Sequence, residues 1–181
     1  MNTAAKPKAN LPGATLKAVI IYDDFDSATR ATALLERVAL RVDAAIKWDI
    51  KPWRSEVLKQ PTLAALTVAV AANADLMVLA LDYAHPPPPE VPHWLKNWAA
   101  HRRIRDAAVL ALHTGAGHVQ SKSWNQIKTL VEERDLTFLG GHRVETHDGP
   151  APFVHRLQQR KQLVAAVSRP SLAERLPVPH H

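Results

Sequence analysis

Residues 15–30 read TLKAVIIYDDFDSATR, and this stretch decides the fold. Its first half, Ala18 to Tyr22, is an apolar run rich in β-branched residues, which is typical of a buried β-strand. The run stops at the acidic turn Asp23-Asp24-Phe25-Asp26, and a helical pattern begins near Ser27. A strand, a polar turn and a helix in this order predict the first unit of an open α/β sheet, whose ligands bind at the carboxyl ends of the strands.

The helix predicted over residues 27–43 carries one apolar stripe. Its apolar residues recur at three- and four-residue spacing, which places them on one face: Ala31, Leu34, Leu35, Val38 and Val42. Asp26 or Ser27 is the expected N-cap, because either side-chain oxygen can accept a hydrogen bond from an unpaired N–H of the first turn.

Four further strand–helix units follow along the chain. The pattern predicts strands over 46–53, 76–81, 107–112 and 137–139, and helices over 61–72, 92–104, 122–134 and 152–168. The strand at 46–53 alternates apolar and polar residues and contains Pro52, so it is expected at an edge of the sheet. The strands at 76–81 and 107–112 are apolar throughout, as central parallel strands are. Five such units predict an α/β three-layer sandwich with a five-stranded parallel sheet in the order 2-1-3-4-5, which is flavodoxin-like.

The sequences of two of these helices predict how each helix is buried. The helix at 61–72 begins at Pro61 and is apolar on nearly every side, so it is expected to be well covered. Trp94 and Trp98 lie one turn apart on the helix at 92–104 and are expected to pack against the sheet. A tryptophan facing outward there, beside the proline run 86–89, would mark a protein-docking site.

Composition narrows the class of protein. The chain has 181 residues and no cysteine, so disulfides, thiolate nucleophiles and cysteine-based zinc sites are excluded.

We predict a single domain over 15–168, a disordered segment over 1–14 and a flexible tail over 169–181. No signal peptide or membrane-spanning run is recognisable, so a cytoplasmic location is expected. The net charge of +6 resides mainly in the two ends, which makes nucleic acid an unlikely partner.

The predicted carboxyl edge gathers the residues on which a site would depend. Asp23 and Asp24 follow the first strand, Asp82 and Tyr83 follow the third, and Thr114 with the nearby glycines follows the fourth. Because parallel strands bring their carboxyl ends to one edge, these residues are expected to line a shared rim. The scattered histidines show no paired metal-ligand spacing, and no metal site is predicted from them.

Residues 78–120 resemble flavin mononucleotide (FMN) reductases that use NAD(P)H. The loop after the third strand reads Leu81-Asp82-Tyr83-Ala84-His85, then a proline-containing stretch and Leu95-Lys96-Asn97, and the loop after the fourth strand reads Thr114-Gly115-Ala116-Gly117. The resemblance implies that Tyr83, Thr114, Gly115 and Gly117 lie around the flavin ring and that Ser27 and Thr29 bind its phosphate. The phosphate turn is degenerate, since the three aspartates there would repel a phosphate dianion.

The same fold also resembles response-regulator receiver domains. On that resemblance Asp23 and Asp24 match the acidic pair, Asp82 matches the phosphoacceptor and Thr114 matches the hydroxyl residue after the fourth strand. The resemblance implies that the three carboxylates hold Mg²⁺. Two functions therefore stay open: an FMN-binding, NAD(P)H-dependent reductase, or a non-catalytic, receiver-like regulatory or scaffolding domain acting through protein contacts. Either is compatible with a homodimer or another protein partner.

Overall fold

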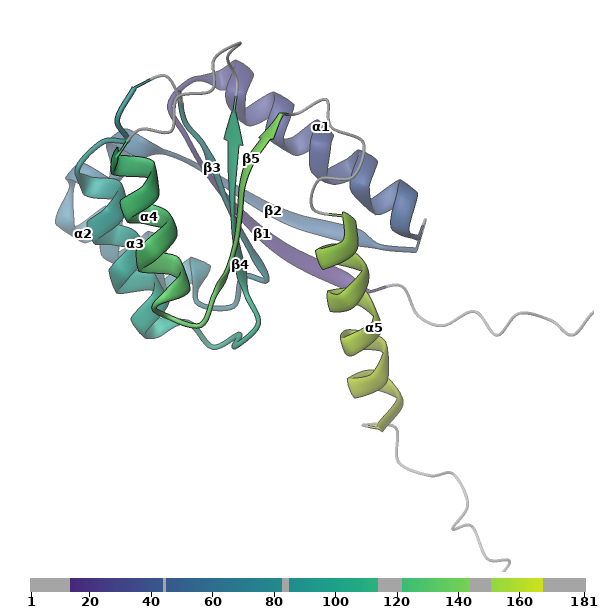
Figure 1. Ribbon diagram of the computed structural model, residues 1–181. Coiled ribbons are helices and arrows are strands. Elements are labelled where there is room, and N and C mark those ends of the chain that lie inside the picture. The colour runs from purple at the N-terminus through teal and green to yellow at the C-terminus, as the bar shows by residue number, and fades with distance from the viewer. Residues whose placement is uncertain (1–13, 44, 83–84, 114–121, 144–150, 168–181) are drawn as a thin grey trace, which may run out of the picture.

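Five parallel strands form the central sheet of the protein (Figure 1). The computed structural model describes residues 14–43, 45–82, 85–113, 122–143 and 151–167. The strands are β1 (Thr15–Tyr22), β2 (Lys47–Arg54), β3 (Leu76–Ala80), β4 (Ala108–His113) and β5 (Thr137–Arg143). Their order is β2-β1-β3-β4-β5, and each neighbouring pair is parallel. The predicted flavodoxin-like arrangement is confirmed.

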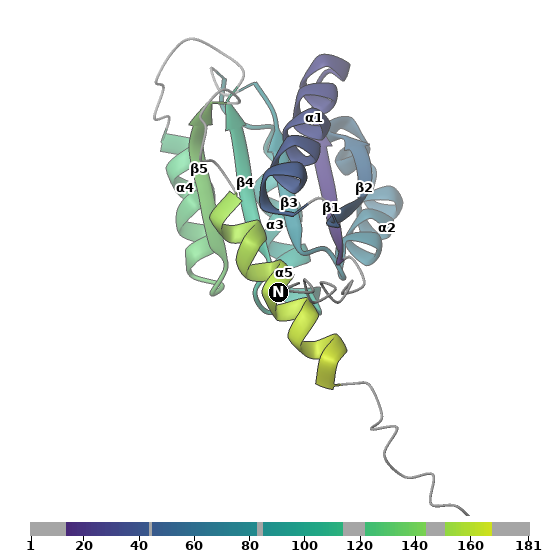
Figure 2. The ribbon, with the colours of Figure 1, turned by 90° about the vertical axis from the view of Figure 1, so that its right-hand side faces the viewer.

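Helices cover the two faces of the sheet. The helices α1 (Phe25–Val42) and α5 (Ala151–Val167) lie side by side on one face, as Figure 2 shows. The opposite face is covered by α2 (Pro61–Ala71), α3 (Glu90–His101) and α4 (Lys122–Glu132), and the short 3₁₀ helix η1 (Ser55–Lys59) connects β2 to α2. Helix α3 is shifted toward the N-terminus relative to the predicted 92–104, and β5 extends beyond the predicted 137–139.

The core is divided by the sheet into two layers. Alternate residues of β1 point to opposite faces, so Val19 and Ile21 pack beneath α2 and α3 while Leu16, Ala18 and Ile20 pack beneath α1 and α5. Every residue of β3 is buried, as predicted for a central parallel strand. β2 is half-exposed and lies at the edge, which is where a strand containing Pro52 is tolerated.

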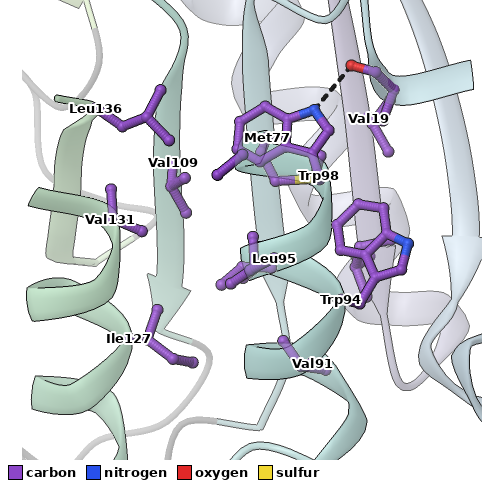
Figure 3. Close-up of a cluster of buried hydrophobic side chains, with 14 of the residues drawn as sticks. Val19, Met77, Val91, Trp94, Leu95, Trp98, Val109, Ile127, Val131 and Leu136 are labelled. Atoms are coloured by element: carbon purple, nitrogen blue, oxygen red, sulfur yellow. Dashed lines mark hydrogen bonds between the residues drawn. The ribbon is translucent and has the colours of Figure 1, made fainter. Parts of the chain in front are cut away.

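Two tryptophans of α3 lie in the core layer between the sheet and the helices α2 and α3 (Figure 3). Trp94 and Trp98 are buried as predicted, and both indoles are anchored to α2. Trp94 Nε1 donates to the Thr67 hydroxyl at 2.7 Å, and Trp98 Nε1 donates to the Ala71 carbonyl oxygen at 2.9 Å. These bonds fix the inner face of α2 against α3.

The outer face of α2 is not covered, and here the prediction that this helix would be well covered is wrong. Leu66 is 50% exposed and Val70 is 38% exposed. Among the described elements, α2 packs mainly on α3 and η1, and its buried residues Thr67, Val68 and Ala71 lie on the inner side, so part of its apolar sequence is exposed to water.

None of the helices in the described ranges is both long enough and apolar enough to cross a bilayer.

Candidate functional site

The carboxyl rim holds some of the predicted site residues within the described part of the chain. Asp23, Asp24, Ser27, Thr29 and Asp82 are placed there by the ends of β1 and β3 and the start of α1. Tyr83, Thr114, Gly115 and Gly117 lie outside the described residues, so the predicted flavin-ring contacts are not described.

Asp24 caps the N-terminus of α1. The Ser27 backbone N–H donates to Asp24 Oδ1 at 2.8 Å, and the Ser27 hydroxyl donates to Asp24 Oδ2 at 2.6 Å. These bonds, with a smaller contribution from the nearby Arg30 guanidinium, hold the pKa of the Asp24 carboxyl below its ordinary value of 3.8. The predicted cap, Asp26 or Ser27, is wrong because Asp24 has the extended backbone that an N-cap needs and both later residues are already helical.

The polar groups expected to bind phosphate have partners inside the protein. Both donors of Ser27 point at Asp24, and Ser27 is buried. The Thr29 hydroxyl donates to the Phe25 carbonyl oxygen at 2.9 Å. A carboxylate therefore occupies the place at this helix end where an anionic ligand would bind. A phosphate would have to displace it and would meet its negative charge.

Asp23 and Asp82 are connected but face different partners. The Ser55 hydroxyl donates to Asp23 Oδ1 at 2.6 Å, and the Asp82 backbone N–H donates to Asp23 Oδ2 at 3.3 Å. The Asp82 carboxylate lies 2.6 Å from His85 Nδ1. Within the described ranges no three histidine, aspartate or glutamate side chains are grouped so that they could hold a metal ion. The metal-binding role that the receiver-like resemblance implies for Asp23, Asp24 and Asp82 stays a prediction.

Comparisons with known proteins find only distant structural similarity. No family model and no curated protein matches this sequence. Among solved structures, the flavodoxin-like domain of a Synechococcus sp. protein is 13% identical, covering 84% of this chain and 99% of that one, with a TM-score of 0.44. A Streptococcus pneumonia TIGR4 flavodoxin is 12% identical, with the same coverages and a TM-score of 0.44. A flavo di-iron protein from Thermotoga maritima is 8% identical over 84% of this chain and 36% of that one, with a TM-score of 0.45. The fold is flavodoxin-like, as its own strand order shows.

A second surface lies on the outer side of α2. Its exposed residues, which we call the α2 surface, share one helix face and carry no charge: Pro61, Thr62, Ala65, Leu66, Ala69 and Val70. Residues 60–74 contain no charged side chain at all. An apolar, uncharged helix face open to water is unusual, because exposed helix faces in soluble domains are normally charged or polar.

A hollow of about 460 Å³ adjoins the α2 surface, between the first turns of α2 and α3. We call it the α2–α3 hollow. Its walls are mostly apolar, with polar groups only on the α3 side, and they are made by Leu58, Pro61, Ala64, Ala65, Pro89, Glu90, His93, Trp94 and Asn97. Pro61 and Ala65 belong to both features, so the hollow and the α2 surface form one continuous region.

Another hollow, between α3 and α4, has a different character. It measures about 420 Å³ and is lined mainly by charged and amide side chains, among them Lys96, Lys122, Glu133 and Arg134. Such a mixture is typical of a hydrated surface. The α2–α3 hollow differs from it in being bordered by an uncharged, apolar helix face.

The apolar sequence of the helix predicted over 61–72 is the signal for the α2 surface, although it predicts a helix that is well covered. Among the described residues, cover is supplied on the inner side of α2, where Thr67, Val68 and Ala71 are buried.

Proposed function

We propose that this protein is a non-catalytic flavodoxin-like domain that acts through protein contacts made by its α2 surface. The observation that carries the proposal is the half-exposed, uncharged helix α2 beside an apolar hollow. Burial of such a face against another protein is favourable at about 25 cal/mol for each Å² of apolar surface removed from water. A surface that combines apolar residues with an adjoining cavity is what protein interfaces use to seat an anchoring side chain.

The rigid seating of α2 supports the same proposal. Two indole hydrogen bonds and the buried Thr67 fix its inner face, so the helix cannot rotate to bury Leu66 or Val70 within its own chain. A preformed face also lowers the entropic cost of binding, because the partner meets a surface that is already ordered.

Site-specific photo-crosslinking in the cell that expresses the protein tests this proposal. A photoreactive residue is placed at Ala69, on the α2 surface, and in a separate variant at Ala33, an exposed alanine of α1 on the opposite face. We expect abundant protein adducts from position 69 and few from position 33. Equal or absent adducts at the two positions would contradict the proposal. Mass spectrometry of the adducts identifies the partner.

A second candidate function is binding of FMN at the carboxyl rim, with NAD(P)H-dependent reduction of the flavin. Two observations support it. The strand order puts a topological switch point at β1 and β3, where such folds bind ligands. Phe25 is 78% exposed at this rim and offers an uncovered aromatic ring to a planar ligand. Against it stands the carboxylate of Asp24 at the helix end.

Fluorescence titration of FMN with the purified protein separates this candidate from the first. Saturable quenching that becomes stronger in Asp24→Asn would place the flavin phosphate at the start of α1, because the variant removes the competing charge. No saturable quenching by either protein would remove the flavin candidate and leave the α2 proposal untouched.

A further inference from the structure

We infer that the α2–α3 hollow binds an organic cation, a protonated amine or a guanidinium group on an apolar stem, whose charged head pairs with Glu90. The inference concerns the hollow itself, so it does not depend on whether a second protein covers the α2 surface. Three observations support it: the size of the hollow, the division of its lining into an apolar and a polar side, and a carboxylate in that lining without a partner.

The hollow has the size and the lining of a site for an amphipathic group. Its volume of about 460 Å³ lies within the range of small-ligand pockets, which begins at about 300 Å³. On one side, α2 contributes only a proline and two alanines. On the other side Glu90, His93 and Asn97 follow one another at helical spacing and form a polar stripe of α3. A group that fits therefore needs an apolar stem and a polar head.

Glu90 is the lining residue that lacks a partner. Its Oε2 atom is buried and accepts no hydrogen bond within the described part of the chain, and Glu90 belongs to none of the ion pairs found there. Helix α3 begins after Pro89 without a side-chain cap, and the Val91 N–H donates to the Pro88 carbonyl oxygen, so the helix end does not use this carboxylate. A carboxylate withdrawn from water without a donor or a counter-charge is costly, and a ligand that supplies both removes that cost.

The charge of the lining selects a cation. Among the described residues that line the hollow, Glu90 is the only carboxylate and there is no lysine or arginine. An anion would be repelled by Glu90, and an uncharged apolar group would displace water from the carboxylate without replacing its hydrogen bonds. An ammonium or guanidinium group makes a charge-assisted hydrogen bond, which is stronger than one from a neutral donor.

Titration of the full-length protein with n-propylguanidinium, followed by NMR of the tryptophan indole N–H groups, tests the inference. Trp94 lines the hollow and reports on its contents, whereas Trp48 packs on the opposite face of the sheet and serves as the reference in the same spectrum. We expect a saturable shift of the Trp94 signal and none of the Trp48 signal. The neutral isostere n-propylurea should bind at least about tenfold more weakly, because it lacks the charge.

Two variants with the same change of charge separate the role of Glu90 from a general effect. Glu90→Gln keeps the size of the side chain and should bind n-propylguanidinium at least about tenfold more weakly than the wild type. Glu56→Gln is the matched control, because Glu56 is an exposed residue of η1 outside the lining, and it should bind like the wild type. An unchanged Trp48 signal shows that each variant is folded. Equal binding by Glu90→Gln and the wild type, equal binding of the two probes, or no saturable shift overturns the inference.

The source of the cation is identified by photo-crosslinking from position 69 in the Glu90→Gln background. Once probe binding depends on Glu90, loss of the adducts assigns the cation to a lysine or arginine side chain of a partner protein, and unchanged adducts assign it to a free small molecule. Adducts from position 69 without any binding of the probe would refute the cation site and keep the proposed function. Probe binding that depends on Glu90, without adducts, would support the cation site and refute the proposed function.

Discussion

Lys161 Nζ lies 2.6 Å from Asp75 Oδ2, although the two residues are far apart in the sequence. Asp75 precedes β3 at the amino edge of the sheet, and Lys161 lies on α5, so this pair ties the last helix to the strands. The buried carboxylate of Asp75 also accepts from the Lys17 backbone N–H at 2.8 Å, and Lys161 Nζ donates to the Thr15 carbonyl oxygen at 2.8 Å. The hydrogen bonds and the ion pair of Asp75 and Lys161 therefore connect α5 to the amino edge of the sheet. The predicted site residues lie at the opposite, carboxyl edge.

Replacing Lys161 with Met should destabilise the protein by about 1–3 kcal/mol. The change leaves the buried Asp75 carboxylate with one fewer donor, and an under-satisfied buried charge is costly. Urea unfolding followed by circular dichroism gives the change in the free energy of unfolding. The control is Lys128→Met, which breaks an exposed ion pair with Glu132 at 4.0 Å and should cost less than about 1 kcal/mol. Equal costs for the two variants would show that the Asp75–Lys161 pair does not hold α5.

Replacing Asp24 with Ala should cost about 1 kcal/mol of stability at neutral pH. The variant loses the cap that satisfies the Ser27 N–H and hydroxyl at the start of α1. Asp24→Asn keeps a capping oxygen and should cost less. Chemical unfolding at pH 7 measures both. An Ala variant as stable as the wild type would mean that Asp24 is not the cap.

The contribution of the Asp24 charge should depend on pH in a defined direction. Its pKa is lower in the folded protein than the ordinary value of 3.8, so the ionised carboxylate stabilises the fold fully above that value. As the pH falls through the lowered pKa, the stabilisation is lost. The stability difference between wild type and Asp24→Asn should therefore shrink between pH 5 and pH 2. A difference that grows on acidification would contradict the assigned direction.

Replacing Trp98 with Phe should destabilise the protein by about 2 kcal/mol, and more than the same change at Trp48. Both indoles donate to a backbone carbonyl oxygen, Trp98 to Ala71 and Trp48 to Leu35 at 2.8 Å. Trp98 is fully buried, so the variant leaves a cavity and removes one of the two hydrogen bonds that the Ala71 carbonyl oxygen accepts, whereas Trp48 is half-exposed at the sheet edge. Thermal unfolding compares the two. A larger cost at Trp48 would refute the role given to Trp98 in seating α2.

The sequence predicted well those features that periodicity encodes. The apolar stripe of α1 reflects burial on one face, and the apolar sequence of β3 reflects burial on both faces. The alternating sequence of β2 reflects partial burial at the edge of the sheet. All three predictions are confirmed. The observed strand order is the flavodoxin-like order that the five strand–helix units predict.

Other features depend on choices that a pattern leaves open. Four residues between positions 23 and 27 have a side-chain oxygen that can cap a helix, and Asp24 is the cap because its backbone is extended while the helix begins at Phe25. The apolar sequence of α2 predicts that the faces of this helix are buried, but it does not identify the element or the protein that buries them. The predicted flavin-ring residues Tyr83, Thr114, Gly115 and Gly117 fall outside the described residues, so their role stays a prediction.

The absence of cysteine from this sequence permits the most direct test of whether the α2 surface is covered. A single cysteine is introduced at Ala69 or, as the control, at Ala33, and its reaction rate with a maleimide is measured in dilute purified protein and in a concentrated extract of the native cell. The account predicts that Cys at position 69 reacts much more slowly in the extract, while position 33 reacts at the same rate in both. Unchanged reactivity at position 69 would contradict it.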